Sequence, residues 1–292
     1  MKKVFLISAL LFATLSLFGQ NLSVAWEELT SQEFAKAVKL SEGVCIIPIG
    51  VIEKHGQHLP LGTDVYTSRE ISLRAASKEY ALVFPFYFVG QINEAKHQPG
   101  TVAYSPELLY KFLQESCDEI SRNGIKKIVI MNGHGGNNSF LQYFCQSQLA
   151  ASKDYARFIF SPEVDTDTQK KISALRKSTT GGHADEVESS VMMYLKPELV
   201  KIDRADSETG MDLNKLSLKN SYTGIWWYGK YPNHYAGDAK GASAEIGELS
   251  VNQKVLQLSE VIKSIKSDET TLDLQRKFYK ESENPLNTNP KR

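Results

Sequence analysis

The sequence has few cysteines and no excess of charge of either sign. Of its 292 residues, three are cysteine, 34 are Lys or Arg and 34 are Asp or Glu, so the formal net charge is zero. Three cysteines cannot make a disulfide framework, and nucleic-acid-binding domains usually carry a basic excess. Charged residues at 23% with aromatic residues at 10% are also inconsistent with a disordered chain. These absences favour a folded domain that does not act on nucleic acid.

Long apolar runs are absent from the sequence beyond its first twenty residues. A lysine pair precedes the almost wholly apolar segment Val4–Phe18, and the sequence becomes polar after Gly19 and Gln20. This order is typical of a secretory signal peptide, and the apolar segment is shorter than the roughly 20 residues that span a bilayer. We therefore expect residues 1–20 to be a signal peptide. The mature protein is expected to be periplasmic or secreted, with no membrane attachment.

Strand-like and helix-like segments alternate along the rest of the chain. The apolar runs, typical of strands buried on both faces of a parallel sheet, are Val44–Ile49, Ala81–Val89, Ile125–Met131 and Arg157–Phe160. The helical patterns are Ser31–Leu40, Thr67–Glu79, Pro106–Arg122, Ser139–Ala151 and Ala184–Leu195. The alternation predicts one domain over residues 21–280, with a three-layer α/β/α fold and a mostly parallel central sheet. Residues 281–292 lack an apolar face and are expected to be a flexible C-terminal tail.

Glycines and metal-binding side chains follow two of the predicted strands. The first run leads into a segment that holds Glu53, His55 and Asp64, and the third run leads into His134. In an open α/β sheet, ligands bind beyond the carboxyl ends of the strands, so these residues are expected to meet there. Glu53 and His55 are two positions apart and would project to the same side of an extended segment.

A third segment of this kind precedes the predicted helix Ala184–Leu195. His183 and Glu186 are three positions apart, a spacing that places two side chains on one face of a helix. Glu188 lies well round that helix from both. Imidazole and carboxylate ligands together suit zinc, manganese or iron, and a bridging carboxylate allows two metals.

Each of these features also has an ordinary interpretation. A histidine after a strand is more often a hydrogen-bonded loop residue than a ligand. A glycine cluster can simply make a turn, or bind phosphate at the start of a helix. The combination is more informative than its parts, because two strand ends and one helix start each supply glycine together with metal-binding side chains.

At these residues the sequence resembles the creatininase family of metal-dependent amidohydrolases. The matching segments are IIPIGVIEKHGQHLPLGTD, PGT, IVIMNGHGGNN, GGHADEVESS followed by KPELV, and GDAKGASAEIGE, in the family's order across Trp26–Leu249. The resemblance implies a creatininase-like fold, a homohexamer and two divalent ions per chain, zinc or manganese with iron as an alternative. It also implies that a metal-activated water hydrolyses a C–N bond in a cyclic or linear small-molecule amide.

Transferred residue by residue, the resemblance makes Glu53, His55, Asp64 and His134 metal ligands. Asp64 would be the bridging carboxylate. His183 matches the family's catalytic histidine, which gives a proton to the leaving nitrogen. The resemblance thus implies one set of residues for the metals and a separate residue for proton transfer.

The chain departs from creatininase itself directly after His134. Creatininase has a tyrosine and then a metal-binding glutamate there, whereas this chain has Gly135 and Gly136. Many relatives share these glycines and carry an extra glutamate in the later helix. We therefore expect Glu186 to be the fifth ligand, with Glu188 as the alternative.

The same departure affects the expected substrate. The tyrosine replaced by Gly135 belongs to the pocket for creatinine, so creatinine is expected to be a poor substrate. Glu94 falls in a segment where relatives contact substrate, and it is a candidate for substrate binding. Trp226 and Trp227 are further candidates, although an aromatic cluster can equally pack in a core.

Two other functions remain open at this point. One is a non-catalytic exported protein that binds a metal or ligand on the same fold. The other is a two-metal phosphoester hydrolase, since such metal sites also act on phosphates. His183 favours an enzyme, because binding alone needs no proton donor.

Overall fold

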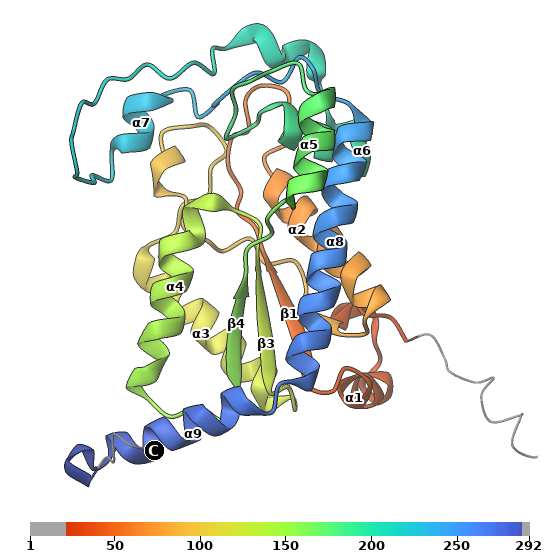
Figure 1. Cartoon of the computed structure of the whole chain (residues 1–292), viewed down its shortest axis with the longest axis vertical. Coiled ribbons are helices and arrows are strands. Elements are labelled where there is room, and N and C mark those ends of the chain that lie inside the picture. The colour runs from red at the N-terminus through yellow and green to blue at the C-terminus, as the bar shows by residue number, and fades with distance from the viewer. Residues whose placement is uncertain (1–21, 288–292) are drawn as a thin grey trace, which may run out of the picture.

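A computed structural model describes residues 22–287 of the chain (Figure 1). Within these residues, four strands form one sheet in the order β2-β1-β3-β4, and every neighbouring pair is parallel. The strands are β1 (Val44–Ile49), β2 (Leu82–Val83), β3 (Lys127–Asn132) and β4 (Ala156–Phe160). The predicted parallel sheet is confirmed. Strand β2 is much shorter than expected, and Pro85, just beyond it, has no N–H for a longer ladder.

Helices cover both faces of the sheet and complete the predicted three layers. One face packs against α1 (Ser31–Leu40), α3 (Pro106–Arg122) and α4 (Asn138–Ser147). The other face packs against α2 (Thr63–Lys78) and α8 (Ala244–Ser267), and α6 (Glu186–Leu195) packs on both of these. The remaining α-helices of the described chain are α5 (Thr166–Leu175), α7 (Trp226–Lys230) and α9 (Thr270–Ser282).

The side chains of β1 alternate between the two cores. Cys45, Ile47 and Ile49 join the core under α3 and α4, while Val44 and Ile46 join the core under α2 and α8. Every residue of β1 is buried. Burying one large aliphatic side chain contributes about 1.5–3 kcal/mol, which explains why the strand is apolar at successive positions.

The chain leaves β1 and β3 toward opposite sides of the sheet. Strand β1 connects through α2 to β2 at one edge, and β3 connects through α4 to β4 at the other. The neighbouring carboxyl ends of β1 and β3 therefore form a topological switch point, where α/β sheets open a crevice for ligands. Helix α7 and the long segment before it lie above this end of the sheet (Figure 1).

The two ends of the chain lie partly outside the described residues. The predicted signal peptide and residues 288–292 fall outside them. Helix α9 extends to Ser282, and a 3-10 turn covers Pro285–Asn287. None of the helices between residues 22 and 287 combines the length and the apolar character needed to cross a bilayer.

Candidate metal centre

The loops after β1 and β3 bring the predicted ligands together. Glu53 and His55 follow β1, His134 follows β3, and Asp64 lies in the first turn of α2. Glu53, His55 and Asp64 are buried, and the His134 side chain is 9% exposed. The strand-end rule thus places four side chains from three segments at the switch point, as expected from the sequence.

Gly50 allows the start of α2 to approach the end of β1. A Cβ atom at position 50 would lie 2.5 Å from the backbone nitrogen of Val65 and 2.6 Å from the backbone carbon of Asp64. Contacts this short do not occur, so only glycine permits this packing. The glycine after the strand therefore determines how close Asp64 comes to the residues that follow β1.

Asp64 lies between the two histidines. Its Oδ1 atom is 3.2 Å from Nε2 of His55, and its Oδ2 atom is 3.1 Å from Nδ1 of His134. Each histidine has a second carboxylate nearby. Oε1 of Glu53 is 2.8 Å from Nδ1 of His134, and Oε2 of Glu188 is 4.0 Å from Nε2 of His55. The potential ligands form three overlapping groups. Two of them share Asp64, namely Glu53, Asp64 and His134, and His55, Asp64 and Glu188; the third consists of Glu53, His55 and His183.

Several atoms of these groups have unused hydrogen-bonding capacity. Within residues 22–287, Oε1 of Glu53, Oδ2 of Asp64 and Nε2 of His134 are buried without a hydrogen-bond partner. Nδ1 of His134 approaches both oxygens, but not with hydrogen-bond geometry. Buried polar atoms are normally satisfied, and these atom types are ligands of zinc and manganese. The residues therefore fit divalent cations.

The carboxylates and imidazoles of the cluster shift one another's pKa. Burial would lower the pKa of His55, but the surrounding carboxylates, Asp64 foremost, raise it to about 9. In the same way, and against burial, Glu53 and Asp64 raise the pKa of His134 well above its usual value. Burial raises the pKa of Glu188 to about 7. In the absence of metal, His55 and His134 therefore carry protons near neutral pH, and a metal ion has to displace them.

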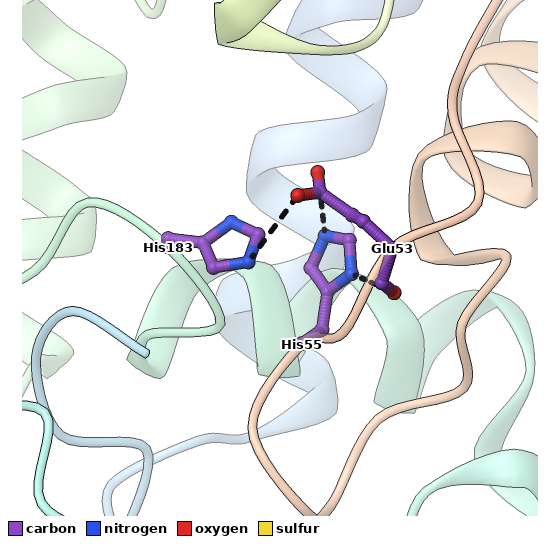
Figure 2. A group of neighbouring side chains, drawn as sticks. All are labelled: Glu53, His55 and His183. Carbon is purple, nitrogen blue, oxygen red and sulfur yellow. Dashed lines mark hydrogen bonds and ion pairs between the residues drawn. The ribbon is translucent and has the colours of Figure 1, made fainter. Parts of the chain in front are cut away.

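His183 lies beside the cluster, and Figure 2 shows the Glu53 carboxylate facing one nitrogen of its ring and one of the His55 ring. The two rings stack with centroids 4.3 Å apart. Nε2 of His183 donates to the backbone carbonyl of Lys54 at 2.8 Å, which leaves a lone pair on Nδ1, 3.8 Å from Oε2 of Glu188. Burial lowers the pKa of His183 well below its usual value. The imidazole is therefore neutral, and Nδ1 can accept a proton.

Glu186 lies away from the cluster, contrary to our expectation of a fifth ligand. Its carboxylate accepts hydrogen bonds from the backbone N–H groups of Lys177 and Ser178, at distances between 2.7 and 3.1 Å. The expected helical pairing fails because α6 begins at Glu186 itself, with Asp185 as its N-cap. His183 precedes the helix, so the two side chains do not share a helix face.

Glu188, the alternative, has the position expected of the fifth ligand. It is one of the three residues of the group with His55 and Asp64. Ala184, between His183 and the cap of α6, has a positive φ of 55°, and its backbone N–H donates to the Glu188 carboxylate at 2.5 Å. This turn brings the start of α6 back toward the loop that carries His183.

The residues predicted to contact substrate line a cavity at the cluster. Glu94, Trp226 and Trp227 border this cavity, whose volume is about 260 Å³. Its wall shares Glu94 and Gly136 with a larger groove of about 810 Å³. A Cβ atom at position 136 would lie 2.4 Å from Nε2 of His134 and 2.7 Å from Oε1 of Glu94. A side chain at position 136 would therefore displace the side chains of His134 or Glu94 from their present positions.

His234 belongs to the site, although the sequence pattern does not predict it. Its Nε2 atom hydrogen-bonds to Oε2 of Glu53, a residue 181 positions earlier in the chain. Its Nδ1 atom lies 2.8 Å from the indole nitrogen of Trp227. His234 follows no predicted strand end or helix start. The signals that point to it are the histidine itself and its position just before the GDAKGASAEIGE segment.

Comparisons with known proteins identify similar chains. The family model described as Creatininase, creatinine amidohydrolase, matches residues 27–262. A creatinine amidohydrolase from Pseudomonas putida is 29% identical over 62% of this chain and 75% of its own length. A mycofactocin precursor peptide peptidase from Mycobacterium ulcerans is 26% identical over 59% of this chain and 66% of its own. A 3-dehydro-scyllo-inosose hydrolase from Thermotoga maritima is 24% identical over 83% of each chain.

Solved creatininase structures share the fold. One described as Creatininase Mn superposes with a TM-score of 0.71 at 24% identity, covering 84% of this chain and 100% of the other. A mutant creatininase of Zn-Zn type gives a TM-score of 0.71 at 25% identity, covering 84% and 99%. The layered α/β fold with its parallel sheet is therefore a known architecture.

Proposed function

This chain belongs to the creatininase family, and from that premise we propose that it is a metal-dependent hydrolase that cleaves the C–N bond of an amide. The observation that carries the proposal is the position of Asp64. Its two oxygens face His55 and His134, in two separate groups of potential ligands. A carboxylate between two such groups is the arrangement by which two-metal hydrolases hold their ions.

Two divalent ions, zinc or manganese, fit this set of donors. One ion would be held by Glu53, Asp64 and His134, and the other by His55, Asp64 and Glu188. Nδ1–H of His55 donates to the backbone carbonyl of Glu53 at 3.3 Å, so the lone pair of Nε2 faces the second group. The carboxylates of Glu53, Asp64 and Glu188 lie close together, and two cations would compensate their negative charge. When bound, the ions supply the Lewis acidity that activates water and polarises a carbonyl.

His183 is proposed to carry the proton during the reaction. The Lys54 carbonyl holds Nε2–H of His183, and so fixes the ring with Nδ1 toward the side of Glu188. The neutral Nδ1 can take the proton that the attacking water loses. It can then deliver that proton to the nitrogen that leaves as the C–N bond breaks. His183 also forms a group of potential ligands with Glu53 and His55, but it belongs to neither of the two groups that share Asp64, so we assign it proton transfer rather than metal binding.

The cavities favour an amide larger than creatinine. The groove of about 810 Å³ that adjoins the metal chamber has a volume typical of sites for ligands of several rings or residues. Its apolar surface comes from Phe140, Tyr222, Ile225 and Tyr228. An amide with an extended substituent would place the scissile bond in the chamber and bury the substituent in the groove. Creatinine has no such substituent, so the groove would not increase its binding affinity.

A peptide bond is the second candidate for the scissile amide. The groove supports it, and one relative is described as a precursor peptide peptidase. Polar groups along the same wall include Gln91, Asn93 and Ser139, which could hydrogen-bond a peptide backbone. Peptide and non-peptide amides require the same proton transfers, so binding in the groove would distinguish them.

Export and assembly remain proposals as well. We propose that the mature protein acts in the periplasm or outside the cell, on the basis of the composition of residues 1–20. Membership of the family supports a homohexamer. N-terminal sequencing of the processed protein and light scattering of the purified protein test these two points.

A substrate panel tests the proposed function. Mature protein reconstituted with zinc or manganese is given creatinine, larger lactams, formamides, N-acyl amines and short peptides, with aryl phosphates as a contrasting class. His183→Ala is assayed in parallel as a control for contaminating activity. Turnover of a larger amide, with little turnover of creatinine, supports the proposal. Cleavage of phosphates alone would indicate a phosphoester hydrolase, and metal binding without any turnover would indicate a binding protein.

A further inference from the structure

We propose that His234 is a positioning residue, which orients Glu53 for metal binding through a hydrogen-bonded chain that begins at Trp227. The inference rests on the proposed metal centre and goes beyond it, because His234 supplies no metal ligand in that scheme. It also gives Trp227 a role that does not depend on contact with the substrate.

Trp227 determines which nitrogen of His234 carries the proton. An indole N–H can only donate, and Nε1 of Trp227 lies 2.8 Å from Nδ1 of His234. Nδ1 must therefore accept this hydrogen bond with its lone pair. The proton of the neutral imidazole is then on Nε2, which donates it to Oε2 of Glu53. Each hydrogen bond in the chain thus runs from donor to acceptor in the order Trp227, His234, Glu53. Because Nε2 of His234 carries the proton, it has no lone pair with which to bind a metal.

The hydrogen bond from His234 gives the two oxygens of Glu53 different roles. His234 holds Oε2, while Oε1 points to Nδ1 of His134 at 2.8 Å, in the ligand group with Asp64. The Glu53 side chain is fully buried, so protein groups rather than solvent set its orientation. With Oε2 held by His234, Glu53 presents Oε1 to a cation. Residues that hydrogen-bond to a metal-binding carboxylate commonly change the affinity of the site for the metal.

The backbone holds the imidazole of His234 in this place. His234 has a φ of 53°, in the left-handed region that residues with a side chain rarely adopt. Its N–H donates to the carbonyl of Tyr231 at 2.9 Å. The carbonyl of Pro232 accepts hydrogen bonds from the side chains of His97 and Gln98, at 2.7 and 2.8 Å. An unusual conformation anchored from two sides, at a buried residue beside a ligand, is the kind of strain that marks a functional position.

Zinc affinity of three His234 variants tests the proposal. Competition with a chromophoric chelator measures both ions, and circular dichroism checks the fold. In His234→Ala, one of the two ions should bind about 10–100-fold more weakly. His234→Gln can place an amide N–H near the position of Nε2 and should recover most of the affinity. His234→Asn is one bond shorter, reaches Trp227 but not Glu53, and should remain weak.

NMR of the ring nitrogens gives a readout that a purely structural role would not change. In the zinc-loaded wild type, His234 should be neutral with its proton on Nε2. Trp227→Phe keeps a ring but removes the indole donor, so a population with the proton on Nδ1 should appear.

The outcomes distinguish this proposal from the proposed function. Equal zinc affinity of wild type and His234→Ala, or a proton on Nδ1 in the wild type, would overturn the role of His234 while leaving the metal centre intact. If the alanine variant does not fold, equal affinity of the glutamine and asparagine variants would overturn it instead. A wild type that binds no metal would refute the metal centre and this proposal together.

Discussion

Helix α6 carries two glutamates whose replacement separates a metal ligand from a structural carboxylate. Glu188→Gln removes a charged donor from the group with His55 and Asp64, so purified protein should hold about one divalent ion per chain in place of about two. The metal-free variant should be slightly more stable than wild type above pH 7. Burial raises the pKa of Glu188 to about 7, so its ionised form opposes folding there.

The size of this gain follows from the exposure of Glu188. Its side chain is 38% exposed, and solvent screening of the charge limits the gain to about 1 kcal/mol. The gain should grow between the usual pKa of a glutamate and about pH 7, and it should vanish below that usual pKa, where both states are protonated.

Glu186→Gln is the matched control on the same helix. The Glu186 carboxylate is fully buried and accepts hydrogen bonds from the backbone N–H groups of Lys177 and Ser178. A glutamine removes the negative charge and, with its oxygen in the position of Oε2, turns its NH₂ group toward the N–H of Lys177. Hydrogen bonds to charged groups contribute about 1.5–3 kcal/mol each, so the variant should lose about 2–4 kcal/mol of stability. For a domain of this size, that corresponds to a decrease in Tm of roughly 5–15 °C.

Elemental analysis and thermal unfolding of both variants complete the test. We expect Glu188→Gln to lose metal without a decrease in Tm in the metal-free form, and Glu186→Gln to keep metal and show a decreased Tm. The opposite assignment of the two effects would show that Glu186 is the ligand and would refute the geometry described here.

Three further predictions concern the same cluster. Asp64→Ala should lose most of both ions, because Asp64 belongs to both ligand groups, and full metal occupancy would show that it is not a bridge. His183→Ala should retain metal but slow turnover by roughly 10²–10⁴-fold, and an unchanged rate would remove it from the mechanism. The pKa of His55 is raised by the surrounding carboxylates from its ordinary value of 6.5 to about 9, so its protonated form stabilises the folded metal-free protein. Its contribution, up to about 3 kcal/mol in urea unfolding, should be lost between these pH values. Zinc affinity should rise over the same interval, and a metal-free stability that stays flat there would contradict the assignment.

Local signals in the sequence account for much of the fold. The bounds of α1, α3 and β1 agree to the residue with the predicted segments. In the structure, a capping box at Thr30, a serine cap at Ser105 and a continuous apolar run mark them. Helix α8 also has a serine cap, Ser243, but its apolar pattern is weaker. It buries Ser250 and Gln253 among its apolar residues, so its stripe is interrupted and the pattern does not predict a helix of 24 residues.

In the site, too, the residues placed by local sequence signals were predictable, and those placed by contacts between distant segments were not. The meeting of Glu53, His55, Asp64 and His134 was predictable because the ends of parallel strands meet at one edge of a sheet. The choice of Glu186 was wrong because it depended on where α6 begins, and Asp185 caps the helix after His183. His234 was missed because its contact with Glu53 joins segments 181 residues apart, and no local pattern encodes that contact.

The central claim is that two metal ions held around Asp64 support hydrolysis of an amide. The most direct test titrates metal-free mature protein with zinc or manganese and measures amine release from the best substrate of the amide panel at each addition. Activity should rise from the background level and reach its plateau at about two equivalents per chain. A plateau at one equivalent, or no amine release at any metal concentration from protein that has bound two ions, would contradict the claim.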